Sequence, residues 1–307
     1  MRELSRSPRP VAALLAALML LLSGCASSTP VSEPVAQAII GAAPAADVSA
    51  VSVAADLVYD EATGQRLDIC SPSTASASPR PAVLVVHGGS WARGGRADEN
   101  WRPICQWLGS AGFVAVSVDY RLAPAAVFPA QIDDVAGALD WLLEPAQTER
   151  YGIDPERVGA FGGSAGGNLV SLLGTAEATS SRLSAVVDLS GPSDLTAAGL
   201  ADDDPVAGVS AAVRTYLGCP DLAACPSARE ASPLAQVDGS EPPFLIVHSA
   251  RERVALSQST RFADELRASG ATAELLVQPG ALHSIALLDD DLRTRVVTFL
   301  HAHLDAP

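Results

Sequence analysis

The sequence predicts an α/β fold, in which a mostly parallel central sheet is covered by helices on both faces. Short apolar runs closed by turn residues recur along the chain, and such runs are typical of buried parallel strands. Stretches of helical length fall between these runs, and this alternation favours a parallel sheet covered on both faces. Of the 307 residues, 48% are hydrophobic and 18% are charged, so the chain has enough apolar material for a large core.

The predicted elements follow one another from about residue 53. A two-stranded start is expected over Asp56–Ile69, around a turn at Thr63 and Gly64. Buried strands are expected at Ala82–Val86, Phe113–Val118, Val158–Phe161, Ala185–Leu189, Phe244–Val247 and Ala273–Val277. Helices are expected at Asn100–Ser110, Ala130–Leu143, Asn168–Thr175, Ser257–Ser269 and Asp290–His303.

Residues 1–24 are predicted to be an export signal and not part of the fold. Arg2, Arg6 and Arg9 precede an apolar run of twelve residues, Val11–Leu22, which is shorter than the ~20 residues of a transmembrane helix. The following Leu-Ser-Gly-Cys25 resembles a bacterial lipobox, whose Cys is lipidated and becomes the first mature residue. The expected product is an exported lipoprotein, anchored to the cell membrane through Cys25 and facing the exterior or the periplasm. Ordinary secretion with an incidental Cys25 is the alternative.

The mature chain is expected to have two parts. Residues 25–52 are rich in Ala, Ser, Pro and Val and predict a flexible tether. Residues 53–307 are expected to form a catalytic domain. Within it, residues 196–228 are irregular and are interpreted as a small lid over the active site.

Charge and composition exclude several functions. The formal net charge of −15 argues against nucleic acid or an anionic membrane surface as the main partner. All 20 basic residues are Arg. The absence of Lys excludes a Schiff-base lysine, a P-loop lysine and a Ser-Lys catalytic pair.

Four cysteines remain after Cys25, an even number that suits an oxidising compartment. Four cysteines allow three pairings. A local Cys219–Cys225 bridge around a Pro-containing turn is the simplest choice, and Cys70 then pairs with Cys105. Free buried thiols are the alternative. Zinc binding is disfavoured because no CxxC or HxxxH spacing is present.

Ser164 is the candidate nucleophile, because Gly162-Gly163-Ser164-Ala165-Gly166 matches G-x-S-x-G. The motif follows a predicted strand and precedes a predicted helix, which is the context of a nucleophile elbow. A tight turn that lifts the hydroxyl needs glycines on either side, since side chains would collide there. The backbone N–H of Ala165 is then one donor to the oxyanion of acyl transfer.

A second Gly-rich motif, His87-Gly88-Gly89-Ser90-Trp91, closes the first buried strand. Its loop lets the backbone approach a substrate and supply the other part of an oxyanion hole. His87 is interpreted as a residue that orders this loop.

These motifs together resemble the α/β-hydrolase superfamily, specifically its secreted carboxylesterase branch of the BD-FAE or hormone-sensitive-lipase-like type. The signatures are HGG-x-W, DYRLAP at Asp119–Pro124 and GGSAGG within Phe161–Asn168. The resemblance runs from about Val53 to the C-terminus. It implies that the N–H groups of Gly89 and Ser90 donate to the oxyanion, with Ser90 in place of a family Gly. It also implies that Asp119 is structural.

The other triad members are expected after Ser164, in the order acid, His. The chain has five His. His283 lies between the last strand and the last helix and resembles the family's catalytic position. His248 ends a strand, and His301 and His303 are expected to be exposed on the last helix.

Glu252 is the candidate acid. The family pattern is His-Gly-x-x-Asp-x-x-Val-Pro, and counting forward from His248 places Glu252 on the Asp. Counting back from Val254, the loop is one residue short, and the longer Glu side chain compensates in this interpretation. The alternative is a surface Glu252 flanked by Arg251 and Arg253. Acidic residues after His283 are expected to begin the last helix: Asp289, Asp290 and Asp291.

The sequence therefore predicts a serine hydrolase that cleaves small-molecule carboxylic esters through an acyl-enzyme, without metal or organic cofactor. Two rivals remain. The HGGSW stretch also resembles kynurenine-formamidase-like amidohydrolases. The altered acid loop favours a non-enzymatic surface binding protein on a degenerate hydrolase scaffold.

Overall fold

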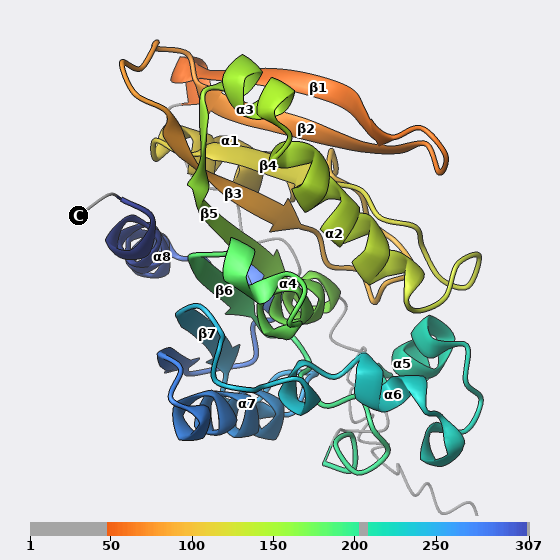
Figure 1. The fold of residues 1–307 in the computed structure, drawn as a ribbon. Coiled ribbons are helices and arrows are strands. Elements are labelled where there is room, and N and C mark those ends of the chain that lie inside the picture. Colours follow the sequence, from red (N-terminus) through yellow and green to blue (C-terminus); the bar gives the residue numbers. More distant parts are fainter. Residues whose placement is uncertain (1–47, 203–207, 306–307) are drawn as a thin grey trace, which may run out of the picture. The chain divides into compact units, whose positions relative to one another are not determined.

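Eight strands form one sheet in a computed structural model that describes residues 48–202 and 208–305 of the chain. Their spatial order is β1-β2-β4-β3-β5-β6-β7-β8 (Figure 1). The bounds are β1 Val51–Asp60, β2 Gln65–Pro72, β3 Arg80–Val86, β4 Val114–Val118, β5 Ile153–Gly163, β6 Ala185–Leu189, β7 Phe244–Ser249 and β8 Ala273–Gln278. The predicted signal segment, Cys25 and the predicted tether up to residue 47 lie outside the described residues.

The sheet is mostly parallel, as the sequence predicts. β1 and β2 form the expected antiparallel hairpin, and β2 also pairs antiparallel with β4. Every other neighbouring pair runs parallel. The sequence of β3 is a continuous apolar run because both faces of this strand are buried. Leu84 and Val86 belong to one core cluster and Val83 and Val85 to the other, because successive side chains point to opposite faces and both faces are buried.

Helices cover both faces of the sheet (Figure 1). Their bounds are α1 Arg102–Ser110, α2 Ala130–Leu142, α3 Pro145–Tyr151, α4 Ala165–Thr175, α5 Val209–Leu217, α6 Ser227–Glu230, α7 Leu256–Ser269 and α8 Asp290–Leu304. Buried residues of α2, α4 and α7 belong to one core cluster, and those of α1 and α8 to the other. Asp289 caps α8 by accepting the Leu292 N–H at 2.8 Å, so the predicted helix start is confirmed. In the described residues, no helix is long and apolar enough to cross a membrane.

Three elements have other bounds than predicted. β1 starts at Val51, two residues before the predicted start at about residue 53, and Val51 pairs with Pro72 and packs against the α1 side of the core. α4 starts at Ala165 and not at Asn168, because the helix follows the nucleophile turn directly. β5 is longer than the predicted Val158–Phe161.

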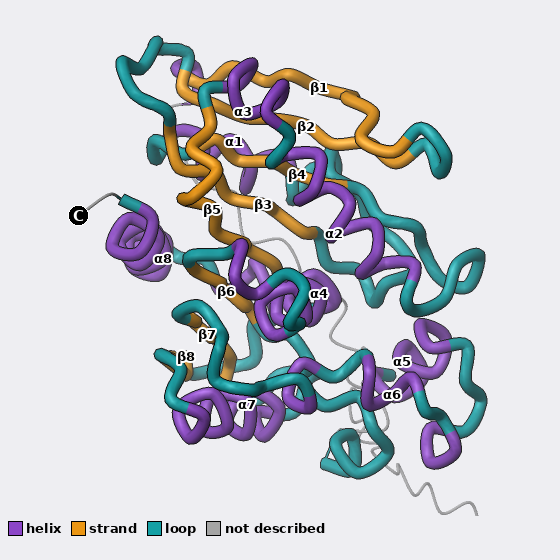
Figure 2. The backbone as a smooth tube through the Cα atoms, viewed as in Figure 1, coloured by secondary structure: helices purple, strands orange, loops and turns teal. Residues whose placement is uncertain are grey.

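Residues 196–228 contain regular structure that the sequence reading missed. Figure 2 shows α5 and α6 in this region, joined by loops. α5 buries Val209, Val213, Tyr216 and Leu217 at helical spacing, and Gly208 and Gly218 bound it. This helix has only nine residues, so its stripe is short. The short helix α3 was also not predicted, although Pro145 stands at its first turn, where proline is favoured.

Of the two histidines expected to be exposed on the last helix, His303 is exposed and His301 is half-buried. Its ring stacks on Phe113 with centroids 4.5 Å apart, and its Nε2 lies 3.1 Å from the Ala111 carbonyl oxygen. The last helix therefore packs this histidine against the turn before β4.

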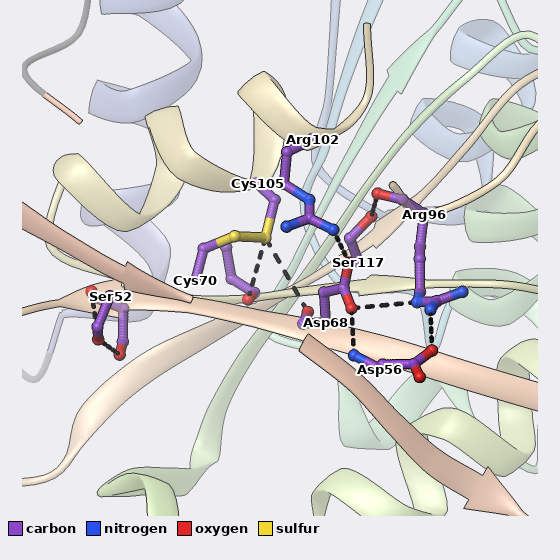
Figure 3. Close-up of a disulfide and its surroundings, with 10 residues drawn as sticks. Ser52, Asp56, Asp68, Cys70, Arg96, Arg102, Cys105 and Ser117 are labelled. Carbon is purple, nitrogen blue, oxygen red and sulfur yellow. Dashed lines mark hydrogen bonds and ion pairs between the residues drawn. A yellow bond between two sulfur atoms is a disulfide. The ribbon is translucent and has the colours of Figure 1, made fainter. Parts of the chain in front are cut away.

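The structure contains the two disulfides that the sequence favours, Cys70–Cys105 and Cys219–Cys225. Cys70–Cys105 joins β2 to α1 (Figure 3). Beside it, the Asp68 side chain is fully buried and forms ion pairs with Arg96 at 3.1 Å and Arg102 at 2.5 Å. A buried carboxylate needs such partners, so covalent and ionic contacts both hold α1 on β2.

Candidate active site

Ser164 stands on the turn between β5 and α4, at the carboxyl end of the parallel sheet. Its backbone has φ 57° and ψ −121°, a strained conformation for a residue with a side chain. A Cβ on Gly162 would lie 2.2 Å from the Gly166 oxygen, and a Cβ on Gly166 would lie 2.1 Å from the Val86 oxygen. Glycine is therefore required at both motif positions, as expected for a nucleophile elbow.

The loop after β3 runs beside this turn. Gly89 has φ 126°, and a Cβ there would lie 2.0 Å from the Arg93 oxygen. Ser90 has φ 56° and lines the same cavity as Ser164. In the described part of the chain, the N–H groups of Gly89, Ser90 and Ala165 donate to no acceptor. Free N–H groups beside a nucleophile suit an oxyanion, because they are already oriented before charge develops.

Residues of the Asp119–Pro124 segment brace this loop. The Tyr120 hydroxyl donates to the His87 carbonyl oxygen at 3.0 Å, and the two rings stack with centroids 4.2 Å apart. Asp119 accepts the Arg96 N–H at 2.8 Å. His87 Nδ1 lies 2.8 Å from the Gly88 oxygen, and burial lowers the pKa of this histidine. These contacts give Asp119 and His87 the structural roles assigned to them from the sequence.

Glu252 and His283 are in contact although 31 residues separate them in sequence. Glu252 lies in the loop after β7, and His283 lies in the loop after β8. The Oε2 atom of Glu252 contacts Nδ1 of His283. The Glu252 side chain is 0% exposed, so the alternative of a surface Glu252 is wrong. A buried carboxylate on Nδ1 fixes the ring so that Nε2 is the nitrogen available to a nucleophile.

His283 also shares a cavity with Ser164. The cavity has a volume of about 210 Å³, and its lining includes Ser164, His283, Trp101 and Ile285. His283 Nε2 is buried and has no hydrogen-bond partner among the described residues. The Ser249 hydroxyl donates to the Leu282 oxygen at 2.6 Å and joins the acid loop to the His283 loop.

The second oxygen of Glu252 lies beside His248, which sequence reasoning did not assign to the site. His248 Nε2 lies 3.0 Å from Glu252 Oε1 and 3.0 Å from the Val254 carbonyl oxygen. Because both neighbours accept, Nε2 carries the proton, and Nδ1 accepts from the Ser259 hydroxyl at 2.7 Å. Burial lowers the pKa of His248, which favours this neutral donor. The only sequence signal was its place at the end of a strand beside the acid loop.

Asp188 is a buried carboxyl below the nucleophile helix. It accepts the Ser171 hydroxyl and the Gly191 N–H, each at 2.8 Å. Burial raises its pKa to about 6, and the nearby Glu252 charge adds to the rise. A Cβ on Gly167 would lie 2.2 Å from Asp188 Oδ1, so α4 approaches this group closely. Among the described residues, no group of three or more His, Cys, Asp or Glu side chains is arranged to hold a metal ion.

Comparison with known proteins gives relatives for this arrangement. The BD-FAE family model matches residues 67–266. Esterase LipC of Mycobacterium tuberculosis is 30% identical over 249 residues, which cover 76% of this chain and 60% of LipC. Arylacetamide deacetylase of Bos taurus is 40% identical over 101 residues, or 33% of this chain and 25% of that protein. The chain thus spans less than two thirds of the length of these curated relatives.

Solved structures share the fold. A carbohydrate esterase from gut microbiota superposes with a TM-score of 0.70 at 24% identity, covering 83% of this chain and 97% of that one. A thermostable carboxylesterase cloned from a metagenomic library has a TM-score of 0.70 at 26% identity, covering 83% of this chain and 90% of that one. The α/β-hydrolase fold predicted from the sequence is confirmed.

Proposed function

Because the chain belongs to the BD-FAE family and has the α/β-hydrolase fold, we propose that it is a carboxylesterase with Ser164, His283 and Glu252 as its triad. The observation that carries the proposal is the buried contact between Glu252 and His283, with His283 and Ser164 lining one cavity. A carboxylate, an imidazole and a strained serine in this order are what nucleophilic acyl transfer requires.

In the first step, His283 Nε2 takes the hydroxyl proton of Ser164 while Oγ bonds to the ester carbonyl carbon. The carbonyl oxygen becomes an oxyanion and accepts hydrogen bonds from the N–H groups of Gly89, Ser90 and Ala165. The Glu252 carboxylate stabilises the imidazolium formed on His283. The ester C–O bond then breaks, and the alcohol leaves with the proton from His283.

In the second step, His283 takes a proton from water as the water oxygen bonds to the acyl carbon of the acyl-enzyme. The bond from that carbon to Ser164 Oγ breaks, and His283 returns the proton to Oγ. The net reaction consumes one water per ester and releases one acid and one alcohol. No redox partner enters this balance.

The test is labelling with a fluorophosphonate probe, followed by peptide mapping of the modified residue. The proposal expects labelling on Ser164, which a binding protein on a degenerate scaffold would not show. Ser164→Ala should abolish labelling and lower ester hydrolysis by more than ~10⁴-fold. Ser180→Ala, at a buried serine in a different part of the fold, is the matched control and should keep both. Labelling at another residue would contradict the proposal, and N-formylkynurenine cleaved faster than any ester would favour the formamidase rival.

We further propose that the enzyme is exported and anchored to the membrane by lipid on Cys25. The support is the basic start, the apolar run Val11–Leu22 and the Leu-Ser-Gly-Cys25 order. Metabolic labelling with an alkyne fatty acid should mark the wild-type protein and not a Cys25→Ser variant. A mature N-terminus at another residue would contradict the anchor and leave the esterase proposal intact.

A further inference from the structure

The turn after β6 contacts the backbone on both sides of the proposed catalytic pair. β6 lies between β5, which leads to the nucleophile, and β7, which leads to the acid loop (Figure 1). At the end of β6, the Leu189 carbonyl oxygen accepts the Ser164 N–H at 2.8 Å. The next residue, Ser190, accepts the Ser284 N–H on its hydroxyl oxygen at 3.1 Å. Ser284 directly follows the proposed catalytic histidine, so two consecutive residues hold the nucleophile and the histidine loop.

Ser190 has a backbone conformation that favours glycine. Its φ is 62°, in the left-handed region where a side chain is costly. Such strain persists only where the surrounding structure enforces it, and it is typical of functional sites. A glycine would adopt this φ at lower cost but would lack the hydroxyl that accepts the Ser284 N–H. This hydroxyl is therefore what a serine adds at the position.

The position of Ser190 is itself fixed by its surroundings. Its N–H donates to the Val247 carbonyl oxygen of β7 at 2.9 Å. The N–H of Gly191 donates to the buried Asp188 carboxyl at 2.8 Å. Ser190 is 0% exposed, so bulk water does not reach its hydroxyl. An acceptor fixed in this way transmits its position to the group that it binds, as the placement of a reactive side chain within about 0.5 Å requires.

Ser284 also lies against the nucleophile turn. A Cβ on Gly163 would lie 2.2 Å from the Ser284 Oγ atom. The nucleophile motif leaves the residue before the serine open, so the elbow alone does not require glycine there. Ser284 has φ 59°, which makes it a second strained serine at the site. The histidine loop therefore packs directly on the turn that carries Ser164.

Two serine hydroxyls hold the chain on either side of His283. On one side, the Ser249 hydroxyl donates to the Leu282 carbonyl oxygen at 2.6 Å. On the other side, the Ser190 hydroxyl accepts the Ser284 N–H. The carboxylate of the proposed triad orients the ring, but a ring that keeps this contact is still displaced from the nucleophile when its backbone moves. The two hydroxyls fix that backbone.

We infer that Ser190 is a positioning residue, whose hydroxyl sets the distance between Ser164 Oγ and His283 Nε2. This inference rests on the proposed esterase function and adds a residue outside the triad and the oxyanion donors. Ser190 is not among the described residues that line the substrate cavity, so it acts on His283 through the backbone and not on the ester. A displacement of about 1 Å between reacting groups lowers a rate by about 10²-fold. Loss of the hydroxyl should therefore slow the chemical step and leave substrate binding unchanged.

The test compares Ser190→Ala with Ser190→Gly in hydrolysis of p-nitrophenyl acetate. Both variants should lower kcat about 10–100-fold and keep KM within about twofold of the wild type. The rate of fluorophosphonate labelling of Ser164 should fall by a similar factor, because labelling needs the same proton transfer to His283. Glycine relieves the positive φ, so Ser190→Gly should unfold at a higher temperature than Ser190→Ala while remaining as slow. This pairing separates the hydroxyl from the stability of the fold, and the glycine variant remains available if the alanine variant does not fold.

Ser193→Ala is the matched control. Ser193 is buried in the same segment, three residues after Ser190, and its hydroxyl donates to the Gln258 carbonyl oxygen at 2.8 Å. This control should lose stability and keep kcat per folded molecule within about twofold.

Three results would overturn the role of Ser190 and leave the esterase proposal standing, provided that the wild type is labelled on Ser164. They are a kcat within about threefold of the wild type in both variants, a wild-type rate in Ser190→Gly alone, and an equal loss of kcat in Ser193→Ala. A wild-type protein that is neither labelled nor able to hydrolyse any ester would overturn both proposals.

Discussion

Glu252→Gln is the substitution that most sharply tests the proposed triad, because the structure dictates how the amide must sit. The Glu252 Oε1 position accepts the Ser249 N–H at 3.4 Å, and His248 Nε2 lies 3.0 Å from the same oxygen. The amide oxygen must therefore occupy this position. The NH₂ group then faces Nδ1 of His283, where the carboxylate oxygen of the wild type lies.

The expected consequence is a histidine in the wrong tautomer. With a donor at Nδ1, the His283 proton moves to Nε2, and this nitrogen no longer accepts the Ser164 proton. The variant also loses the negative charge that stabilises the imidazolium. Removing the carboxylate in this way costs a serine-hydrolase triad about 10⁴ in kcat, or about 5 kcal/mol of transition-state stabilisation. KM should change by less than about threefold, since Glu252 is buried behind His283 and does not line the substrate cavity.

The assay is steady-state hydrolysis of p-nitrophenyl acetate, together with thermal unfolding to show that the fold is kept. Glu241→Gln is the matched control, because Glu241 is a buried glutamate before β7 that accepts the N–H groups of Asp238 and Gly239. This control should lose stability without losing kcat per folded molecule. A Glu252→Gln enzyme within tenfold of the wild-type kcat would refute the tautomer argument and remove Glu252 from the triad.

Other contacts lead to further predictions. His248→Leu should lower kcat about 10–100-fold at nearly constant KM, because the buried Glu252 carboxylate loses its polar neighbour at 3.0 Å, and His248→Gln should restore most of the rate; a KM effect alone would contradict this role. Burial raises the Asp188 pKa to about 6, so its protonation stabilises the fold at low pH, and this stabilisation is lost as pH rises from 4 to 6. In urea unfolding, the free energy of unfolding of the wild type should therefore fall by roughly 3 kcal/mol between pH 4 and 7.5, and Asp188→Asn should abolish this fall. The same pH dependence in the variant would contradict the prediction. Replacing Cys70 and Cys105 by Ser should lower the free energy of unfolding by about 4 kcal/mol, against about 2 kcal/mol for the Cys219–Cys225 pair, whose loop is shorter; equal losses in denaturant unfolding would contradict the loop-length argument.

The sheet was predictable from the sequence because each strand carries its own signal. Ala82–Val86 is apolar on both faces, since helices bury both sides of a parallel sheet. α5 was not predictable in the same way. Only four of its nine residues are buried. One of them, Tyr216, packs against Trp91 and Phe128, which are distant in sequence. Its helical pattern has meaning only once those partners are in place.

The site residues also differ in whether they could be predicted from local sequence. Ser164 and the loop at Gly89 belong to local motifs. Their glycines indicate, from the sequence alone, a backbone that leaves no room for side chains. The partnership of Glu252 with His248 cannot be read from either residue. His248 and Ser259 are 11 residues apart, and the burial of all three side chains depends on how β7 and α7 pack.

The acid loop shows how a change in loop length and a change in residue type can cancel. The two ends of the loop are joined: His248 lies near the end of β7, and the Val254 carbonyl oxygen lies 3.0 Å from His248 Nε2. Counted back from Val254, this loop has one residue fewer than the related pattern, so a longer side chain suits the reach to His283. Glu252 has the additional methylene, and its two oxygens contact His248 on one side and His283 on the other. We interpret the replaced aspartate and the shorter loop as two changes that compensate for each other, because the longer side chain lets the carboxylate contact His283.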